Sequence, residues 1–310
     1  MRPWQAYLLC FIGVCGHASS EFVARLADTP GPEFTVWRFL IGGSCLVILS
    51  QLWPGASNLW EPLKKDGVRI VILSCLGMTL GQLFFHWGLD FTSVVQVATM
   101  VTTMPIFVVF VDRLVNGTPV TKPKLVSGIG AFLGVAFLLS NSVEGAAFQV
   151  GNLDDLIGTL MAMFCGLLGA IYLVLARPLV QEYGPVRMTT YSFAIGFFFL
   201  YFVVGSFWGV WVNPLSLVEK EPHQIAGIIT IGVWNTCIGF AVWLAGLAAA
   251  PDSQRANYIF FLKPVIAAFL AVAILGDTLS VLQILAILAI CFCVLLEYVW
   301  TSRNAKAAAA

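Results

Sequence analysis

The stretch from about Pro251 to Leu275 is largely apolar, and it constrains the fold more than any other feature of the sequence. About 20 apolar residues are enough for an α-helix to cross the hydrocarbon core of a bilayer. Lys263 lies near the middle of this stretch, where a charge costs about 2.5–3.5 kcal/mol to insert. Pro264 follows and removes a backbone donor at the same depth. A cation beside a predicted helix break inside a membrane indicates a polar cavity.

Similar apolar runs recur along the whole chain, which is 59% hydrophobic and only 10% charged, against about 25% charged residues in soluble domains. We therefore predict an all-α integral membrane protein with ten transmembrane helices. The predicted spans are at about 4–26, 34–52, 68–89, 92–112, 123–140, 154–180, 186–208, 223–249, 251–275 and 279–299.

The distribution of basic residues predicts the orientation in the membrane. Segments on the side of the termini hold most of the lysines and arginines, whereas the loops on the other side hold only Arg25 and Lys220. Basic residues accumulate on the cytoplasmic side of membrane proteins. We therefore expect a multi-pass protein of the cell (inner) membrane with both termini in the cytoplasm.

Two pairs of sequence signatures indicate that the chain is duplicated. Gly31-Pro32 recurs as Gly184-Pro185, an offset of 184 − 31 = 153, and Met104-Pro105 corresponds to Lys263-Pro264, an offset of 264 − 105 = 159. We predict two five-helix repeats, at 4–140 and 154–299. Because five is odd, the second repeat crosses the membrane inverted relative to the first. Inverted repeats are typical of secondary transporters, with the substrate near the midplane.

The sequence also resembles the EamA-type family of the drug/metabolite transporter superfamily. The resemblance rests on the repeats, on the segments 86–93 (HWGLDFTS) and 245–251 (AGLAAAP), and on the turn at 275–280 (LGDTLS). It implies a central cavity lined by helices 1–4 and 6–9, with helices 5 and 10 at the periphery. Members of this family move amino acids, nucleotide precursors, sugars and other metabolites, and many carry glutamate or another residue where this chain has Lys263.

The ionisable residues inside the predicted spans are the first site candidates, since such residues are expensive in a membrane. Lys263 binds an anionic substrate group or alternates with a coupling proton; alternatively, it pairs with a carbonyl released by Pro264. Glu21 and His17 share a face of helix 1 and form a coupling or substrate site, or Glu21 pairs with Arg25 or Arg38. Arg38 binds substrate, partners Glu21, or extends to the outer surface.

Polar and aromatic residues at mid-depth complete the predicted site, because polar atoms there must face protein or water. Gln82 and His86 line an outer vestibule or form interhelical hydrogen bonds. Pro105 and Pro264 are the predicted helix breaks or hinges. The remaining substrate-binding candidates are Gln96, Thr99, Thr103, Trp234, Asn235, Trp243, Asn257 and Tyr258.

These features favour a secondary transporter that moves a small polar metabolite by alternating access. Efflux of amino acids or related metabolites is the first candidate, and uptake of a similar metabolite is the alternative. An intramembrane enzyme is disfavoured because the sequence has no His-Glu-x-x-His or Gly-x-Ser-x-Gly motif. We predict no cofactor, no metal and no nucleic-acid partner; the expected partners are the metabolite, the lipid bilayer, and a coupling proton or counter-substrate.

Overall fold

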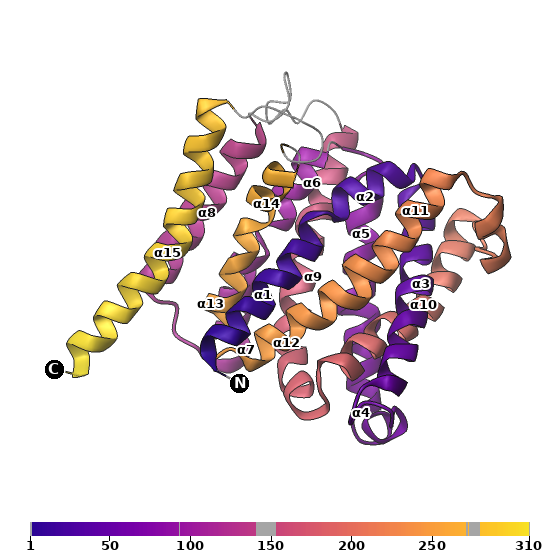
Figure 1. Cartoon of the computed structure of the whole chain (residues 1–310), viewed down its shortest axis with the longest axis horizontal. Helices are drawn as coiled ribbons and strands as arrows, with labels where there is room; N and C mark the ends of the chain where they lie inside the picture. The colour runs from indigo at the N-terminus through magenta and orange to yellow at the C-terminus, as the bar shows by residue number, and fades with distance from the viewer. Residues whose placement is uncertain (1, 93, 141–152, 271, 273–279, 310) are drawn as a thin grey trace.

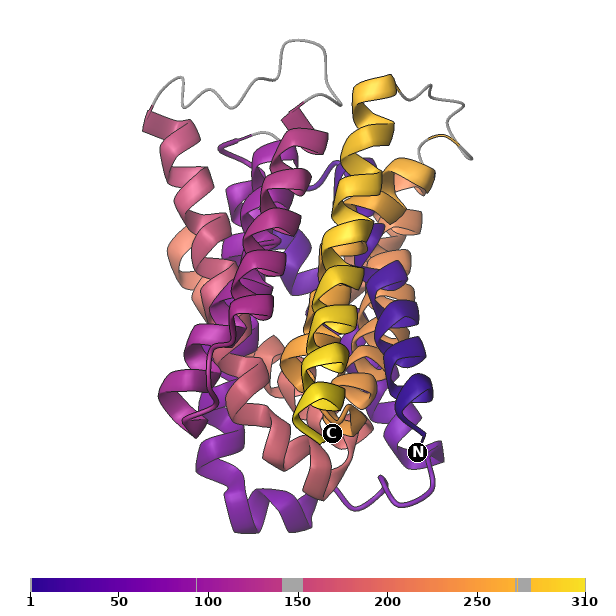
Figure 2. The ribbon, with the colours of Figure 1, turned by 90° about the vertical axis from the view of Figure 1, so that its left-hand side faces the viewer.

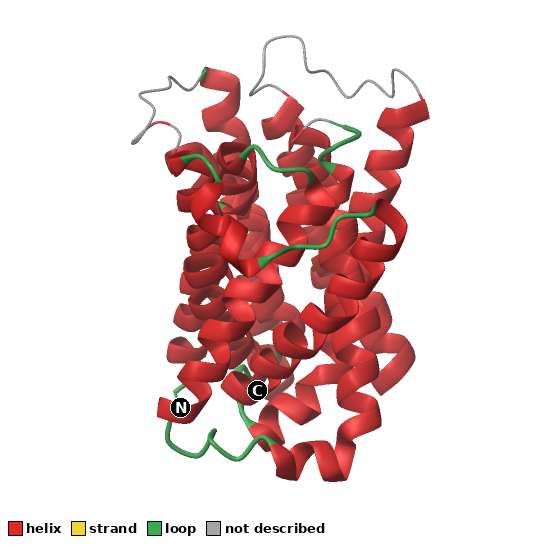
Figure 3. Cartoon of the chain, turned by 90° about the vertical axis from the view of Figure 1, so that its right-hand side faces the viewer, coloured by secondary structure: helices red, strands yellow, loops and turns green. Residues whose placement is uncertain are grey.

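The computed structural model describes the backbone of the whole chain except residues 1, 93, 141–152, 271, 273–279 and 310. It does not describe the side chains of residues 21, 25, 94–96, 138–140, 298 and 301–309 either. Every regular element in the described part is a helix, and the helices form a bundle with both chain termini at the same end (Figures 1, 2 and 3).

The helices follow one another with short connections. The first part of the chain forms α1 (Pro3–Ala18), α2 (Ser20–Ala27), α3 (Gly31–Leu52), α4 (Trp60–Ile72), η1 (Leu73–Thr79), α5 (Leu80–Gly88), α6 (Val94–Val101), α7 (Met104–Asn116) and α8 (Lys122–Ser140). The second part forms α9 (Leu153–Tyr183), α10 (Pro185–Trp208), η2 (Pro214–Glu219), α11 (Pro222–Thr230), η3 (Ile231–Phe240), α12 (Ala241–Ala249), α13 (Ser253–Asn257), η4 (Tyr258–Leu262), α14 (Lys263–Leu270) and α15 (Val281–Ala309).

The outer surface of this bundle suits a lipid environment. Seven helical segments of the described chain are long and apolar enough to cross a membrane. Large apolar side chains such as Leu133, Phe198, Phe202 and Phe292 are exposed on the outside. Exposed apolar surface of this extent marks an interaction with membrane rather than with water. The protein is therefore a multi-pass membrane protein.

Two of the breaks in these helices coincide with the proline signatures. α7 begins at Met104-Pro105, and α14 begins at Lys263-Pro264 directly after the 3₁₀ segment η4. Proline is tolerated in the first turn of a helix, where its missing N–H would have no partner. Each proline thus starts a new helix inside an apolar stretch.

A third break lies at the end of α1. The sequence predicted that His17 and Glu21 share a face of one helix, whereas α1 ends at Ala18 and α2 begins at Ser20. The hydroxyls of Ser19 and Ser20 donate to the carbonyls of Gly16 and His17, at 3.1 and 2.7 Å. Side-chain bonds of this kind compete with the helical backbone ladder. The side chain of Glu21 lies outside the described part of the structure, so the face that it shares with His17 stays a prediction.

Two π-helical segments, η1 and η3, were not predicted. In η1 the hydroxyl of Thr79 donates to the carbonyl of Ser74 at 2.6 Å, and in η3 the hydroxyl of Thr236 donates to that of Ile231 at 2.8 Å. Both bonds reach back five residues and therefore suit the wider π turn. Such segments often occur at functional sites, and both of these lie next to the pocket described below.

Helices α8 and α15 pack against each other at one edge of the bundle (Figures 1 and 2). A Cβ atom added at Gly130 would lie 2.9 Å from the Sγ of Cys293, and one added at Gly134 would lie 2.8 Å from a side-chain carbon of Ile290. The two glycines therefore allow the close approach of α15. Among the side chains that the structure covers, neither helix of this pair lines the central pocket that is described below.

Candidate functional site

A pocket lies in the middle of the bundle, between segments that are far apart in the sequence. The space inside it that no protein atom fills, counting the part open to solvent, is about 540 Å³. The pocket is lined by His17, Ser20, Arg38, Met78, Gln82, Phe85, Val101, Met104, Cys165, Gly166, Gly169, Tyr172, Leu173, Phe240, Trp243, Phe260 and Lys263.

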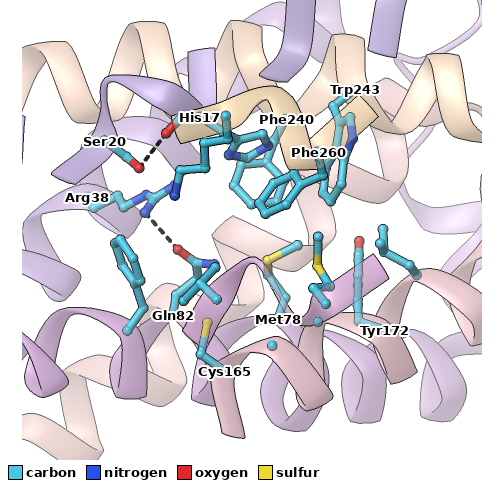
Figure 4. A pocket seen from close by; sticks show the side chains of 17 residues that line it. His17, Ser20, Arg38, Met78, Gln82, Cys165, Tyr172, Phe240, Trp243 and Phe260 are labelled. Carbon is cyan, nitrogen blue, oxygen red and sulfur yellow. Dashed lines mark hydrogen bonds between the residues drawn. The ribbon is translucent and has the colours of Figure 1, made fainter. Parts of the chain in front are cut away.

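Arg38, on α3, is the cation of this pocket that comes from the first part of the chain. Its side chain is only 1% exposed. Its Nε donates to the hydroxyl of Thr236 at 3.0 Å, and its Nη1 donates to the Oε1 of Gln82 at 2.7 Å (Figure 4). The guanidinium also lies 5.6 Å from the ring centroid of Phe240, within the range of a cation–π contact. The alternative in which Arg38 extends to the outer surface is wrong, because these contacts hold the side chain inside the bundle.

Lys263, the first residue of α14, is the cation that comes from the second part of the chain. It is 4% exposed, and its Nζ lies 5.4 Å from the ring centroid of Phe85 and 5.6 Å from that of Phe260. Aromatic faces stabilise an ammonium group without neutralising it. Arg38 and Lys263 thus add positive charge to a pocket whose other described walls are mainly apolar.

His17 and Trp243 bring two ring nitrogens to the same pocket. The two rings meet edge to face, with centroids 4.8 Å apart, and the ring of His17 also contacts Phe240 at 4.4 Å (Figure 4). The Nε2 of His17 and the Nε1 of Trp243 are buried without a hydrogen-bond partner among the described residues. Buried polar atoms are nearly always hydrogen-bonded, so these two nitrogens are candidates to bind a polar group in the pocket.

The opposite wall comes mainly from α9 and η1, with Met78, Cys165 and Tyr172 facing the aromatic cluster (Figure 4). The hydroxyl of Tyr172 shares a hydrogen bond of 2.7 Å with that of Ser192. The pocket therefore has an aromatic wall, a thioether and thiol wall, and a polar end at Arg38 and Gln82. This arrangement can bind a small molecule that has both a polar end and an apolar body.

The structure brings together the predicted residues His17, Arg38, Gln82, Trp243 and Lys263. His86 packs behind them, where its Nδ1 lies 3.0 Å from the hydroxyl of Thr35 and its Nε2 lies 3.4 Å from the Nη1 of Arg38. His86 therefore contacts Arg38 rather than the pocket.

Several other predicted residues do not line this pocket. Asn235 donates to the hydroxyl of Ser19 at 3.0 Å and holds α1 against η3. Tyr258 donates to the carbonyl of Lys124 on α8. Thr103 donates to the carbonyl of Met100 at 2.6 Å. Trp234 is 39% exposed.

The remaining predicted residues lie at different places in the structure. Thr99 is buried but is absent from the lining of the pocket. Asn257 lines a second pocket. Pro105 and Pro264 each lie at the start of a helix. The side chains of Glu21 and Gln96 lie outside the described part of the structure.

Most of the lining that sequence reasoning missed is apolar. The sequence prediction selected polar residues within apolar spans. That criterion does not select aromatic residues such as Phe85, Tyr172, Phe240 and Phe260. One signal was present: Gly166 and Gly169 match Gly13 and Gly16 at the offset of 166 − 13 = 153. This match could have placed α9 opposite α1 at the site.

The described side chains contain no group of three or more His, Cys, Asp or Glu residues that could hold a metal ion. For binding, the described lining of the pocket offers two cations, an amide, two ring nitrogens and aromatic faces.

Comparison with known proteins gives a consistent result. The model of the EamA-like transporter family matches residues 4–140 and 156–298. YyaM, an uncharacterized transporter of Bacillus subtilis (strain 168), is 24% identical over 258 residues, which are 80% of this chain and 78% of that protein. An uncharacterized transporter of Clostridium kluyveri is 22% identical over 314 residues, which cover 98% of this chain and 95% of the relative. One crystal structure shares the fold, with a TM-score of 0.80 and 16% identity, over 98% of this chain and 99% of the other.

Proposed function

The chain belongs to the EamA-like transporter family, and from this membership we propose that it is a secondary transporter that moves a small polar metabolite by alternating access. The observation that carries the proposal is a central pocket that buries two cations, Arg38 and Lys263. Intramembrane ionisable residues usually mark a substrate or ion pathway, because they are costly to keep.

We further propose that the bundle consists of ten spans in two inverted repeats, at 4–140 and 154–299. The lining of the pocket supports the duplication, because residues from both repeats occupy it at corresponding positions. The pairs Gln82 with Phe240 and Phe85 with Trp243 share the offset 240 − 82 = 158, and the pairs Val101 with Phe260 and Met104 with Lys263 share the offset 263 − 104 = 159. The π-helical segments η1 and η3 begin at the first of these offsets, 231 − 73 = 158.

The substrate that suits this pocket carries an anionic group such as a carboxylate. Arg38 offers a planar set of donors that matches a carboxylate, and Lys263 adds a point charge. The Nε2 of His17 and the Nε1 of Trp243, which have no hydrogen-bond partner in the described part of the chain, can bind a further polar group. Aromatic rings line the remaining space. We therefore propose amino acids or related metabolites as the substrate class and efflux across the cytoplasmic membrane as the direction, with both termini in the cytoplasm.

Transport by purified protein in proteoliposomes tests this proposal. Vesicles loaded with each of the twenty L-amino acids in turn are assayed for exchange with labelled amino acid outside. Lys263→Met preserves the length of the side chain and removes the charge, so we expect a loss of transport of at least about tenfold. Lys64→Met is the matched control, because Lys64 is exposed outside the pocket, and it should transport at the wild-type rate.

The direction and the coupling are read from the same vesicles. Sorting the protein by orientation separates efflux from uptake, and dissipating an imposed proton gradient tests for a coupling proton. Transport by Lys263→Met at the wild-type rate, with the Lys64→Met variant equally active, would refute the role given to the pocket. Transport of none of the twenty amino acids would refute the substrate class.

A further inference from the structure

A second pocket adjoins the central one on the side of the chain termini. The space inside it that no protein atom fills, counting the part open to solvent, is about 430 Å³, and it shares Leu173 with the central pocket. Along α9 its lining continues from Leu173 through Val174 to Arg177, and along α7 it continues from Met104 of the central pocket to Val108 and Asp112. The two pockets therefore follow one another along the same helices.

The polar atoms of the second pocket include an amide with no partner. Asn257 is 1% exposed, and neither its Nδ2 nor its Oδ1 has a hydrogen-bond partner among the described residues. The Nε of Arg177 is likewise buried without a partner, while its Nη2 donates to the carbonyl of Ala250 at 3.0 Å. Buried donors and acceptors that the protein leaves open favour a bound molecule that fills them.

Asp112 supplies the opposite charge in the same pocket. Its Oδ2 accepts from the Nε2 of Gln254 at 2.6 Å and its Oδ1 accepts from the Nδ2 of Asn116 at 2.5 Å. These bonds fix the carboxylate in place, and each oxygen retains capacity for another donor. With Arg177, the pocket therefore presents one positive and one negative group, whereas the described lining of the central pocket presents two positive groups.

We propose that the second pocket is a binding station for an aliphatic L-amino acid between the central pocket and the side of the termini. The carboxylate of the amino acid accepts from the Nε of Arg177 and the Nδ2 of Asn257. Its ammonium group donates to the Oδ1 of Asn257 and is attracted by Asp112. The side chain of the amino acid packs on Val108, Val174 and Leu247, which line the same space.

This assignment rests on the proposed function, since it places a second station on the route of the transported solute. It also goes beyond that function, because a single central site is sufficient for alternating access. Two stations predict that the purified protein binds two molecules of the amino acid, each in a pocket with its own set of side chains.

Equilibrium dialysis of the detergent-purified protein with tritiated L-leucine measures the number of bound molecules. We expect two equivalents for the wild type and one for Asn257→Leu, because this change removes the open amide and fills its place with an apolar group. We expect one equivalent for Lys263→Met, which removes the cation of the central pocket only. Leu114→Met is the control outside both pockets, because Leu114 is 85% exposed and lines neither of them, and it should retain two equivalents.

Two competitors test the chemistry of the second station in the Lys263→Met background. 4-Methylpentanoate lacks the ammonium group of leucine, and isoamylamine lacks its carboxylate, so each should compete at least about tenfold more weakly than unlabelled leucine. Because the side chain of Asn257 makes no hydrogen bond to any described residue, Asn257→Leu should keep the thermal unfolding midpoint of the wild type, which shows that the loss of binding is local.

One equivalent in the wild type that Asn257→Leu leaves unchanged would overturn the second station and leave the transporter standing. Competition by isoamylamine as strong as by leucine would also overturn it, since the carboxylate would then make no contact. Failure of the transport assay in vesicles is a separate result, and it would refute the proposed function whatever the dialysis shows.

Discussion

Replacing Gly13 with alanine is a direct test of how closely α1 and α12 pack beside the pocket. A Cβ atom at this position would lie 2.4 Å from the Cβ of Trp243, 2.7 Å from its Cα and 2.9 Å from its backbone nitrogen. Carbon atoms in contact prefer about 3.5–4.0 Å. Because the clash involves backbone atoms of Trp243, no change of rotamer relieves it, and the two helices must separate by about 1 Å.

The expected loss of stability follows from two opposing terms. Overpacking a close-packed interior costs typically about 1–3 kcal/mol, and a backbone clash belongs at the upper end of this range. Alanine in place of glycine in a helix recovers about 1 kcal/mol. We therefore expect a net loss of about 2 kcal/mol. At roughly 2–4 °C per kcal/mol, the unfolding midpoint should fall by about 4–8 °C.

Two other glycines provide the comparison. At Gly166, which corresponds to Gly13 in the proposed second repeat, an added Cβ would lie 3.1 Å from the Oγ1 of Thr103 and 3.5 Å from the carbonyl oxygen of Met100. At Gly67 nothing lies within 4 Å. In Gly166→Ala, the gain in helix propensity should therefore roughly offset the cost of the close contact with Thr103. In Gly67→Ala no such contact forms, so the gain should make the protein more stable.

The assay is tryptophan fluorescence of detergent-purified protein during heating, together with leucine transport in proteoliposomes. The expected order of midpoints is Gly67→Ala highest, Gly166→Ala next and Gly13→Ala lowest. Gly13→Ala should also reduce transport, because it displaces Trp243 from the pocket wall. A midpoint for Gly13→Ala equal to that of Gly67→Ala would show that α1 and α12 do not make this contact, and the position given to Trp243 would be wrong.

Two further predictions concern charged groups away from the pocket. Glu297 is 0% exposed and accepts from the Nε of Arg255 at 2.8 Å. Arg255→Met leaves this buried carboxylate without its cation, so the free energy of unfolding should fall by about 3–5 kcal/mol. The double variant Arg255→Met/Glu297→Leu should recover most of this loss in chemical unfolding, and a double variant no more stable than the single one would contradict the reasoning. Partial burial raises the pKa of Asp90, in the loop after α5, although the N–H of Gly31 donates to it and opposes the shift. Because the pKa of Asp90 is higher in the folded than in the unfolded protein, its protonated form stabilises the folded state. This stabilisation is fully present below the unfolded-state pKa and is lost as pH rises through the folded-state pKa. The unfolding midpoint should therefore decline as pH rises through this range in the wild type and not in Asp90→Asn, and parallel pH profiles would contradict the shift.

The helices themselves could be predicted from the sequence, since long apolar runs in a chain with few charges leave few alternatives to membrane helices. Their interruptions could not. The break after Ala18 and the π segments depend on hydroxyl groups that bond to carbonyls three to five residues earlier. Whether a serine or threonine makes such a bond depends on packing against other helices, which a single sequence does not reveal.

The candidate site could be predicted only in its polar part. Lys263, Arg38 and Gln82 were recognisable because polar groups at this depth need partners or water. The apolar walls were not, because lipid and protein interior select the same side chains. Phe260 and Phe269 show this: both lie in the same predicted span, yet Phe260 is 4% exposed on the pocket wall and Phe269 is 68% exposed. Without a polar face, the period of the helix does not show which side is inside.

If the two halves are copies as proposed, their differences explain how the pocket can distinguish the ends of a substrate. At the positions that correspond in the proposed repeats, Gln82 matches Phe240 and Met104 matches Lys263, so each pair has one polar and one apolar member. Two identical repeats would create a symmetric pocket with two equal sets of contacts, which an asymmetric solute could enter in either orientation with the same free energy. Divergence at these pairs removes the degeneracy, because the first repeat contributes an amide where the second contributes an aromatic ring, and the second contributes a cation where the first contributes a thioether. On the proposed function, a requirement for binding in one orientation accounts for the retention of a buried cation such as Lys263, which would otherwise destabilise the bundle.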